Sequence, residues 1–202
     1  REELSDIESI KKSVLVNGCH MVTNIIKKSL FEDYDLWYPE NILYEDNANR
    51  APLFLVADTI NIYYNQTPMY FYRINNQSTM RSINNVHHWD RLVTANMFLM
   101  HTKRLGLYER YQQEIEYSHY MLFVLGSFMF AVFSFTKYQY GKIKQIIEEY
   151  ENNIGIKAIR LNRYYRSNES IHKRIAEILY YAPIVGYFFM FYCNLKRRVK
   201  RI

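Results

Sequence analysis

Two adjacent carboxylates, Glu45 and Asp46, are the residues of this chain whose type and spacing best suit chemistry. The apolar run L-F-L-V-A at 53–57 follows them, and the pattern predicts a helix that begins just after the pair and is capped by Asn47 or Asn49. Because the N-terminal end of a helix carries partial positive charge, it favours ionised carboxylates, which suit a general base more than a general acid. The simpler interpretation is that the pair is only a solvated first turn.

Pro52 limits where this helix can begin. Proline has no backbone N–H to donate, so it is tolerated in the first turn of a helix, where that group has no partner in any case. We therefore expect Pro52 to lie in the first turn.

Short motifs surround the carboxylate pair in a fixed order along the chain. They are K-K-S-L-F at 27–31, Y-P-E-N-I-L at 38–43, Y-E-D-N at 44–47, A-D-T-I at 57–60, Y-F-Y-R at 70–73 and S-T-M-R at 78–81. The ordered set resembles the second half of the catalytic domain of family 2 glycosyltransferases, the nucleotide-sugar enzymes that build bacterial surface polysaccharides. The resemblance covers about residues 20–82.

The resemblance implies an α+β chain that is mainly helical. Residues 1–82 would be the acceptor-side part of a GT-A catalytic domain with short strands, and residues 83–202 a helical C-terminal extension packed on it. Runs of β-prone side chains predict the strands at 19–26, 59–64 and 69–74. The chain begins at arginine without a leader sequence, and we expect it to be a fragment whose nucleotide-binding half lies elsewhere.

The same resemblance assigns roles to the carboxylates. Asp46 would be the general base that deprotonates an acceptor sugar hydroxyl, so that transfer inverts the anomeric carbon of the donor. Glu45 would orient the acceptor or the base. The implied partners are a nucleotide-sugar donor and a growing glycan or lipid-linked acceptor.

Four residues further along would bind the donor diphosphate or the acceptor. They are Arg73, Ser78, Thr79 and Arg81. A guanidinium group suits phosphate oxygens, because its planar fork can donate two parallel hydrogen bonds. For Arg73 the alternative is an ordinary surface residue. The full-length enzyme would also use a divalent cation, Mg²⁺ or Mn²⁺, with ligands mostly outside this chain.

No metal site is predicted within the chain itself. The triplet D-Y-D at 33–35 has the spelling of the metal-binding Asp-x-Asp, but it follows the Ser-Leu-Phe turn, and turn chemistry alone explains two Asp residues in a loop. His87 and His88 open a helix predicted at 85–104. Neighbouring helical residues point about 100° apart, so we do not expect these two histidines to form a joint site; the alternative is that one of them alone contributes to a metal or diphosphate site.

Other helices follow from apolar periodicity and capping residues. We predict them at 4–16, with the capping box S-D-I-E at 5–8, at 139–152, and from 167–170 to about Tyr181. Arg110 and Glu114, four residues apart, are predicted to pair on a solvated face.

The nearly unbroken apolar run at 120–135 predicts a buried helix, since sixteen residues fall short of the roughly twenty that span a bilayer. An intramembrane or interfacial helix is the alternative.

The C-terminal end combines a second apolar run with clustered positive charge. Residues 184–195 are apolar and aromatic, and five of the last seven residues are Lys or Arg, so the net charge of +6 comes mostly from this tail. Such a segment suits the anionic inner face of a cell membrane. A packed C-terminal helix with a solvated tail is the alternative.

The two cysteines, Cys19 and Cys193, are far apart and show no metal-binding spacing, which indicates a reducing compartment. We therefore expect a cytoplasmic protein at or near the inner face of the membrane.

Three classes of function follow from these observations. The first is part of an inverting glycosyltransferase. The second is a membrane-surface interaction module that acts through the apolar and basic C-terminal region without catalysis of its own. The third, a nucleic-acid-binding protein, is disfavoured, because the positive charge lies in one short run instead of a distributed basic face.

Overall fold

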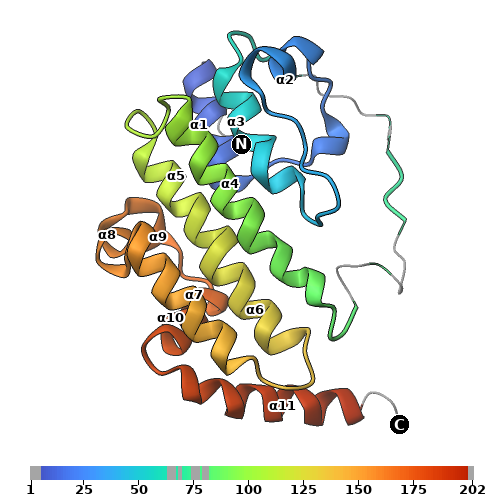
Figure 1. Cartoon of the computed structure of the whole chain (residues 1–202), viewed down its shortest axis with the longest axis vertical. Coiled ribbons are helices and arrows are strands. Elements are labelled where there is room, and N and C mark those ends of the chain that lie inside the picture. The colour runs from blue at the N-terminus through green and yellow to red at the C-terminus, as the bar shows by residue number, and fades with distance from the viewer. Residues whose placement is uncertain (1–5, 63–66, 68–69, 74–77, 79–81, 200–202) are drawn as a thin grey trace.

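The computed structural model describes residues 6–62, 67, 70–73, 78 and 82–199, and this part of the chain consists of helices, turns and coil (Figure 1). In chain order the elements are α1 (Ile7–Asn17), the short 3₁₀ helix η1 (Met21–Thr23), α2 (Lys28–Tyr34), α3 (Asp46–Val56), the 3₁₀ helix η3 (Val86–Trp89), α4 (Asp90–Arg104), α5 (Gln112–His119), the π-helical segment η4 (Tyr120–Leu125), α6 (Gly126–Phe133), α7 (Tyr140–Asn153), α8 (Ile156–Leu161), α9 (Arg163–Ser167), α10 (Ile171–Tyr181), the 3₁₀ helix η5 (Pro183–Val185) and α11 (Gly186–Val199).

The predicted α+β fold is wrong, because 69% of the chain is helical and the described residues contain no strand. The segment 19–26 is coil interrupted by η1, and the described parts of the other two predicted strands, 59–62 and 70–73, are also coil. A β-prone run becomes a strand only when a neighbouring strand pairs with its backbone, and none does so among the described residues. Val22 and Ile25 accordingly face solvent.

The start of α3 also differs from the sequence prediction. Glu45 is the N-cap residue and Asp46 the first helical residue, so Asn47 and Asn49 lie inside the helix and Pro52 in its interior. Asn49 does not cap the helix because it is fully buried, where its side-chain amide donates to the carbonyls of Leu36, at 2.9 Å, and of Trp37. Tertiary contacts therefore fix this position.

Most other helices lie where periodicity and capping residues predict them. Asp6 caps α1, its Oδ1 accepting from the Ser9 backbone N–H at 2.8 Å, while Ser5 lies outside the described residues. Ser170 caps α10 by accepting from the Lys173 backbone N–H at 3.2 Å. These side chains satisfy backbone donors that the first turn of a helix leaves without partners.

The longest helical run crosses the middle of the bundle. α5, η4 and α6 are continuous over the 22 residues Gln112–Phe133, about 33 Å at 1.5 Å per residue. Within the described residues this is the one helix long and apolar enough to cross a membrane, and 67% of its most apolar stretch is buried inside the protein. The structure thus places the apolar run at 120–135 in the core, as the sequence predicts, and extends the helix further towards the N-terminus.

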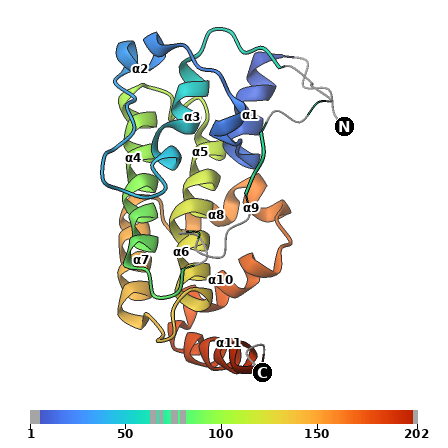
Figure 2. The same ribbon diagram turned by 90° about the vertical axis from the view of Figure 1, so that its right-hand side faces the viewer.

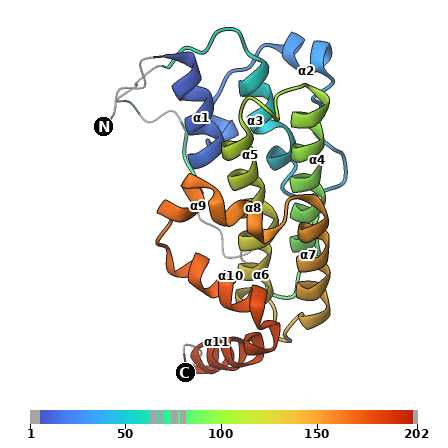
Figure 3. The same cartoon turned by 90° about the vertical axis from the view of Figure 1, so that its left-hand side faces the viewer.

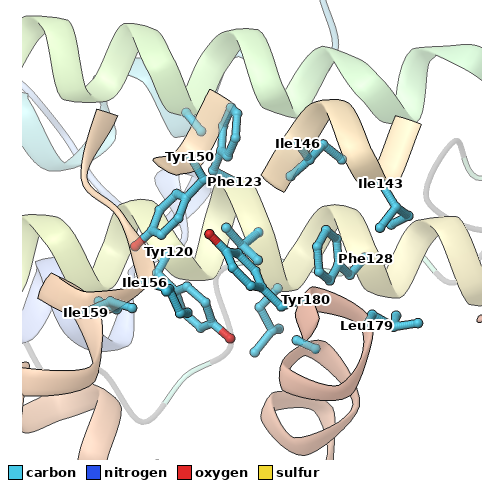
Figure 4. Packing of buried hydrophobic residues seen from close by; sticks show 14 of the residues in the cluster. Tyr120, Phe123, Phe128, Ile143, Ile146, Tyr150, Ile156, Ile159, Leu179 and Tyr180 are labelled. Atoms are coloured by element: carbon cyan, nitrogen blue, oxygen red, sulfur yellow. The ribbon is translucent and has the colours of Figure 1, made fainter. Parts of the chain in front are cut away.

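Two hydrophobic clusters lie along this central helix. The first joins α1, α3, α4 and α5, and its buried members are Val14, Leu15, Ala51, Leu55, Phe98, Leu99, Tyr111 and Ile115. The second, which we call the interior aromatic cluster, fills the space between η4, α6, α7, α8 and α10, where Figure 4 shows Tyr120, Phe123, Phe128, Tyr150 and Tyr180 packed with aliphatic side chains. Because α4 contributes to both clusters, the two are structurally linked; the predicted division at residues 82 and 83 stays a prediction.

The predicted pair of Arg110 and Glu114 on a solvated face is wrong. Arg110 pairs with Glu8 of α1 at 2.8 Å, whereas the carboxylate of Glu114 is buried and accepts from Arg163 Nη2 and from the Tyr164 hydroxyl, both at 2.7 Å. Burial raises the pKa of Glu114, but these donors outweigh burial and lower it overall. Partners distant in sequence decide both pairings.

The two ends of the bundle differ in their elements. α2 and α3 lie at one end, and α11 lies across the other, as the turned views confirm (Figures 2 and 3).

Candidate functional site

Glu45 and Asp46 lie at the start of α3, next to η3 and the start of α4. The Asp46 side chain is 41% exposed and Glu45 faces solvent. Asp46 is thus reachable from outside and in line with the first backbone N–H groups of α3, which stabilise negative charge there.

The turn before the pair is held in an uncommon backbone conformation. Tyr44 has a φ of +61°, in the left-handed region that L residues rarely adopt. On one side, the Leu43 backbone N–H donates to Asp90 Oδ2 at 3.0 Å. On the other, the Tyr44 hydroxyl lies 2.7 Å from His88 Nδ1. These contacts with η3 and α4 fix the turn that presents Glu45 and Asp46, and strained residues held in this way are concentrated at functional sites.

His88 serves to support this turn. It is fully buried, and its ring stacks on Phe130 with 4.3 Å between centroids. His88 Nε2 lies 2.9 Å from the carbonyl of Ser82, which can only accept, so Nε2 carries the proton and Nδ1 accepts from the Tyr44 hydroxyl. Both nitrogens are occupied, which leaves neither of them for a metal ion.

A partly buried cation lies behind the turn. The Arg91 guanidinium carbon is 5.1 Å from the centre of the Tyr44 ring and 4.9 Å from that of Phe130, so the group lies between two aromatic rings. Burial lowers the pKa of Arg91, while the negative charge of Asp46 acts in the opposite direction. The close packing depends on Gly126, because a Cβ there would lie 2.9 Å from the Arg91 guanidinium carbon.

A second cation lies next to Asp46 on α3 itself. Arg50 Nη1 is 3.8 Å from Asp46 Oδ2 and donates to the carbonyl of Cys19 at 3.0 Å. A separation of 3.8 Å is an ionic contact and too long for a hydrogen bond, so the carboxylate oxygen stays open to another donor. Asp46 therefore lies beside a cation without being tied to it by a hydrogen bond.

Tyr38 adds a phenol on the same side. Burial raises the pKa of Tyr38, and the charges of Asp46 and Glu45 raise it further, so the hydroxyl stays protonated at neutral pH. Burial likewise raises the pKa of the Cys19 thiol, against the effect of Arg50. Neither group supplies a ready nucleophile.

The structure describes two of the four other predicted site residues, Arg73 and Ser78. Arg73 is exposed in coil and Ser78 is half-buried, and among the described residues no hydrogen bond or ion pair joins either of them to Glu45 or Asp46. Thr79 and Arg81 lie outside the described residues.

The described part of the chain offers no metal centre, since no three of its His, Cys, Asp or Glu side chains gather to hold an ion. The predicted loop at 33–35 is wrong for Asp33, which belongs to the last turn of α2, whereas Asp35 lies in the turn after the helix with a φ of +49°. Arg104 Nη2 holds this helix end by donating to the carbonyls of Tyr34 and Asp35 at 2.8 and 3.1 Å. The residues present here do not form ligands for the divalent cation that the resemblance implies.

Sequence reasoning missed Arg50, Arg91 and His88 as parts of this site. Arg50 carries a usable signal, because it lies four residues after Asp46 on one helix. Arg91 and His88 reach the turn only through tertiary packing of η3 and α4, and nothing in the local sequence indicates this.

Comparisons of the chain with protein-family models, with curated proteins and with solved structures give no match. The resemblance to family 2 glycosyltransferases therefore depends on the ordered motifs alone.

Proposed function

We propose that this chain is the acceptor-side part of an inverting glycosyltransferase, with Asp46 as its general base. The observation that supports this best is the carboxylate of Asp46, which is partly open to solvent at the start of α3 and lies 3.8 Å from Arg50. The strained turn at Tyr44, fixed by His88 and Asp90, presents it.

The chemistry requires one proton transfer and one substitution. As the acceptor O–H bond breaks, its proton passes to a carboxylate oxygen of Asp46 and the oxygen forms a bond with the anomeric carbon of the donor. The bond between that carbon and the nucleoside diphosphate breaks on the opposite face, so the configuration inverts. The negative charge of the base is stabilised beforehand by the helix terminus and Arg50.

The surrounding residues position the base. Arg91 and His88 hold the Tyr44 ring and hydroxyl, and the Tyr44 backbone sets the direction in which α3 begins. Glu45, which is exposed, is available to orient the acceptor. In this proposal the donor and its divalent cation bind mostly to residues outside this chain, and the enzyme works on the cytoplasmic side. Cys19 and Cys193 form no disulfide, which fits that compartment.

The test is sugar transfer by the full-length enzyme that this proposal requires, with Asp46→Asn. We expect kcat to fall by about 10²- to 10⁴-fold with little change in KM, because the variant keeps the shape of the side chain but cannot take the proton. Asp33→Asn on the exposed part of α2 is the matched control and should leave the rate unchanged. Glu45→Gln should have an intermediate effect.

A normal rate for Asp46→Asn, with an unchanged circular dichroism spectrum, would show that Asp46 is not the base. If no length of the protein transfers sugar, the second function stands: an interaction module that acts through the apolar and basic C-terminal region.

A further inference from the structure

The inner side of α11 is fixed to the end of the bundle. Met190 is buried there, and Phe189 and Cys193 pack against the interior aromatic cluster. The Asn194 side-chain amide donates to the carbonyl of Thr136 at 3.1 Å, and the Tyr138 hydroxyl donates to the carbonyl of Pro183 at 2.7 Å. α11 is therefore a positioned helix.

The outer side of α11 and of the turn before it is apolar and open. Its side chains, which we call the α11 face, are between 45% and 74% exposed, and they are Ile184, Tyr187, Phe188, Phe191, Tyr192 and Leu195. They recur at three- and four-residue intervals, which places them along one side of the helix. Exposed apolar groups gathered into one patch mark an interaction site more often than scattered ones do.

Positive charge borders this face. No Asp or Glu follows Glu177, and Lys196, Arg197, Arg198, Lys200 and Arg201 come at the C-terminal end. Lys196 is exposed and its ammonium lies 4.7 Å from the centre of the Tyr192 ring, directly at the edge of the face. Lys137 is exposed next to Thr136, which holds Asn194.

We propose that the α11 face docks on an anionic lipid bilayer, with α11 lying in the plane of its surface. Tyr and Phe side chains suit the boundary between headgroups and acyl chains, and Lys and Arg suit the anionic headgroups. This surface is independent of Asp46, so the inference goes beyond the proposed function.

Length and charge decide between the occupants of this face. At 14 residues α11 is about 21 Å long, too short for the roughly 30 Å hydrocarbon core, so it lies on a bilayer and does not cross it. A second copy of the chain would bring its own row of cations against the first, whereas an anionic surface has the complementary charge.

The position of α11 makes this docking geometrically simple. It lies across the end of the bundle opposite α2 and α3 (Figures 1 and 3), so a flat surface can reach the helix without meeting the α3 end.

Co-sedimentation of the chain with lipid vesicles tests the proposal. We expect binding to phosphatidylcholine vesicles that contain about 30% phosphatidylserine, weak binding to phosphatidylcholine alone, and weakening by salt. The double variant Phe188→Ser/Phe191→Ser should reduce binding at least tenfold. Replacing Lys196, Arg197 and Arg198 with Gln should reduce binding to the anionic vesicles by about fivefold per cation.

Two exposed apolar residues elsewhere provide the matched control. Ile25→Ser and Leu161→Ser remove side chains that are more open to solvent than those of the α11 face, and they should leave vesicle binding unchanged. All variants change surface residues, so circular dichroism should confirm an intact fold.

Failure of the unmodified chain to sediment with anionic vesicles would overturn the proposal, as would equal loss of binding in the control variants. Light scattering supplies a third outcome. If the chain is a dimer that Phe188→Ser/Phe191→Ser converts to a monomer, and no vesicle binding occurs, the face joins two copies of the chain and the bilayer proposal is wrong.

Discussion

Two regions of this molecule contain the same kinds of side chain in opposite environments. The interior aromatic cluster holds Phe and Tyr rings with almost no exposed surface, such as Phe128 and Tyr150. The α11 face carries Phe and Tyr rings that are mostly open, such as Phe188. Both regions are rich in aromatic residues, yet only the first stabilises the fold by removing them from water.

The difference depends on whether each aromatic ring has another ring packed against it. In the interior, each ring meets another: Tyr120 lies edge-on to Tyr165 with 5.0 Å between centroids, and Tyr150 lies edge-on to Tyr180 at 6.5 Å. Tyr150 is fully buried, and this burial strongly raises the pKa of its hydroxyl. On α11, Tyr187 lies edge-on to Tyr138 with 4.9 Å between centroids, whereas among the described residues no ring pairs with Phe188, Phe191 or Tyr192. These three rings are the ones available to a partner.

The strongest test of this comparison replaces the same residue type in both regions. Phe128→Ala should lower the free energy of unfolding by about 3–5 kcal/mol, because it removes a fully buried ring and leaves a cavity. Phe188→Ala should change it by about 0.5 kcal/mol or less, since that ring is 74% exposed. Urea denaturation measures both.

Equal costs for the two substitutions would break the comparison. A large cost for Phe188→Ala would show that the α11 face is covered in solution by another part of the protein or by a second copy.

The acid stability of the chain tests how dry the interior is. His119 is fully buried, stacks on Phe123 at 5.1 Å and on Tyr150 at 5.9 Å, and burial lowers its pKa to about 3. The unfolded chain titrates this group near 6.5, so below that pH the unfolded state binds more protons than the folded state. The contribution of the neutral His119 side chain to the free energy of unfolding is therefore fully present above pH 6.5. It is lost as the pH falls towards 3, by about 1.4 kcal/mol per pH unit.

Measuring urea denaturation between pH 7 and pH 5 checks this slope. His119→Gln should flatten it, whereas exposed His20→Gln should leave it unchanged. His101 contributes in the same direction, because burial and then Arg104 lower its pKa, so the comparison is best made in a His101→Gln background. If the slope persists in His119→Gln, His119 does not cause it. The imidazole of His119 would then be in contact with water in the folded state.

Elements set by local pattern could be predicted from the sequence. α7 and α10 lie close to their predicted positions, because apolar side chains recur at helical spacing and Ser170 supplies a cap for α10. The apolar run at 120–135 was correctly predicted as a buried helix. In each case residues within a few turns of one another hold the information.

Elements set by distant partners could not be predicted. The β-prone segment at 19–26 stays coil because no strand pairs with it among the described residues, and Asn49 is taken from a capping role by burial against Leu36. Glu114 pairs with Arg163, 49 residues away along the chain, and not with the predicted partner Arg110. Such choices depend on packing, which local propensity does not contain.

In the candidate site, too, some residues are placed by local pattern and others by distant contacts. The place of Asp46 at the start of a helix follows from local pattern, and so does its pairing with Arg50 four residues later. The supports of the turn, Arg91 and His88, lie more than forty residues away along the chain and come together only in the folded protein.

The smallest predicted effects concern how firmly α11 is attached. A Cβ at Gly186 would lie 2.0 Å from Cζ of Tyr138, so Gly186→Ala must push that ring away and weaken its hydrogen bond to the Pro183 carbonyl. We expect a loss of about 1–2 kcal/mol in urea denaturation. Gly141→Ala on α7 meets open space and should stabilise the chain by about 0.5 kcal/mol through helix propensity.

These two glycines separate packing at the α11 end from a general effect of removing glycine. If Tyr138→Ala is added to Gly186→Ala, the clash disappears, so the double variant should be more stable than the sum of the two single changes predicts. Additive losses would mean that the ring of Tyr138 does not lie against Gly186 in solution. The inner side of α11 would then be loosely held. A helix that moves freely on the bundle cannot present one fixed side to a partner, so the contrast between the packed interior and the open α11 face would no longer stand.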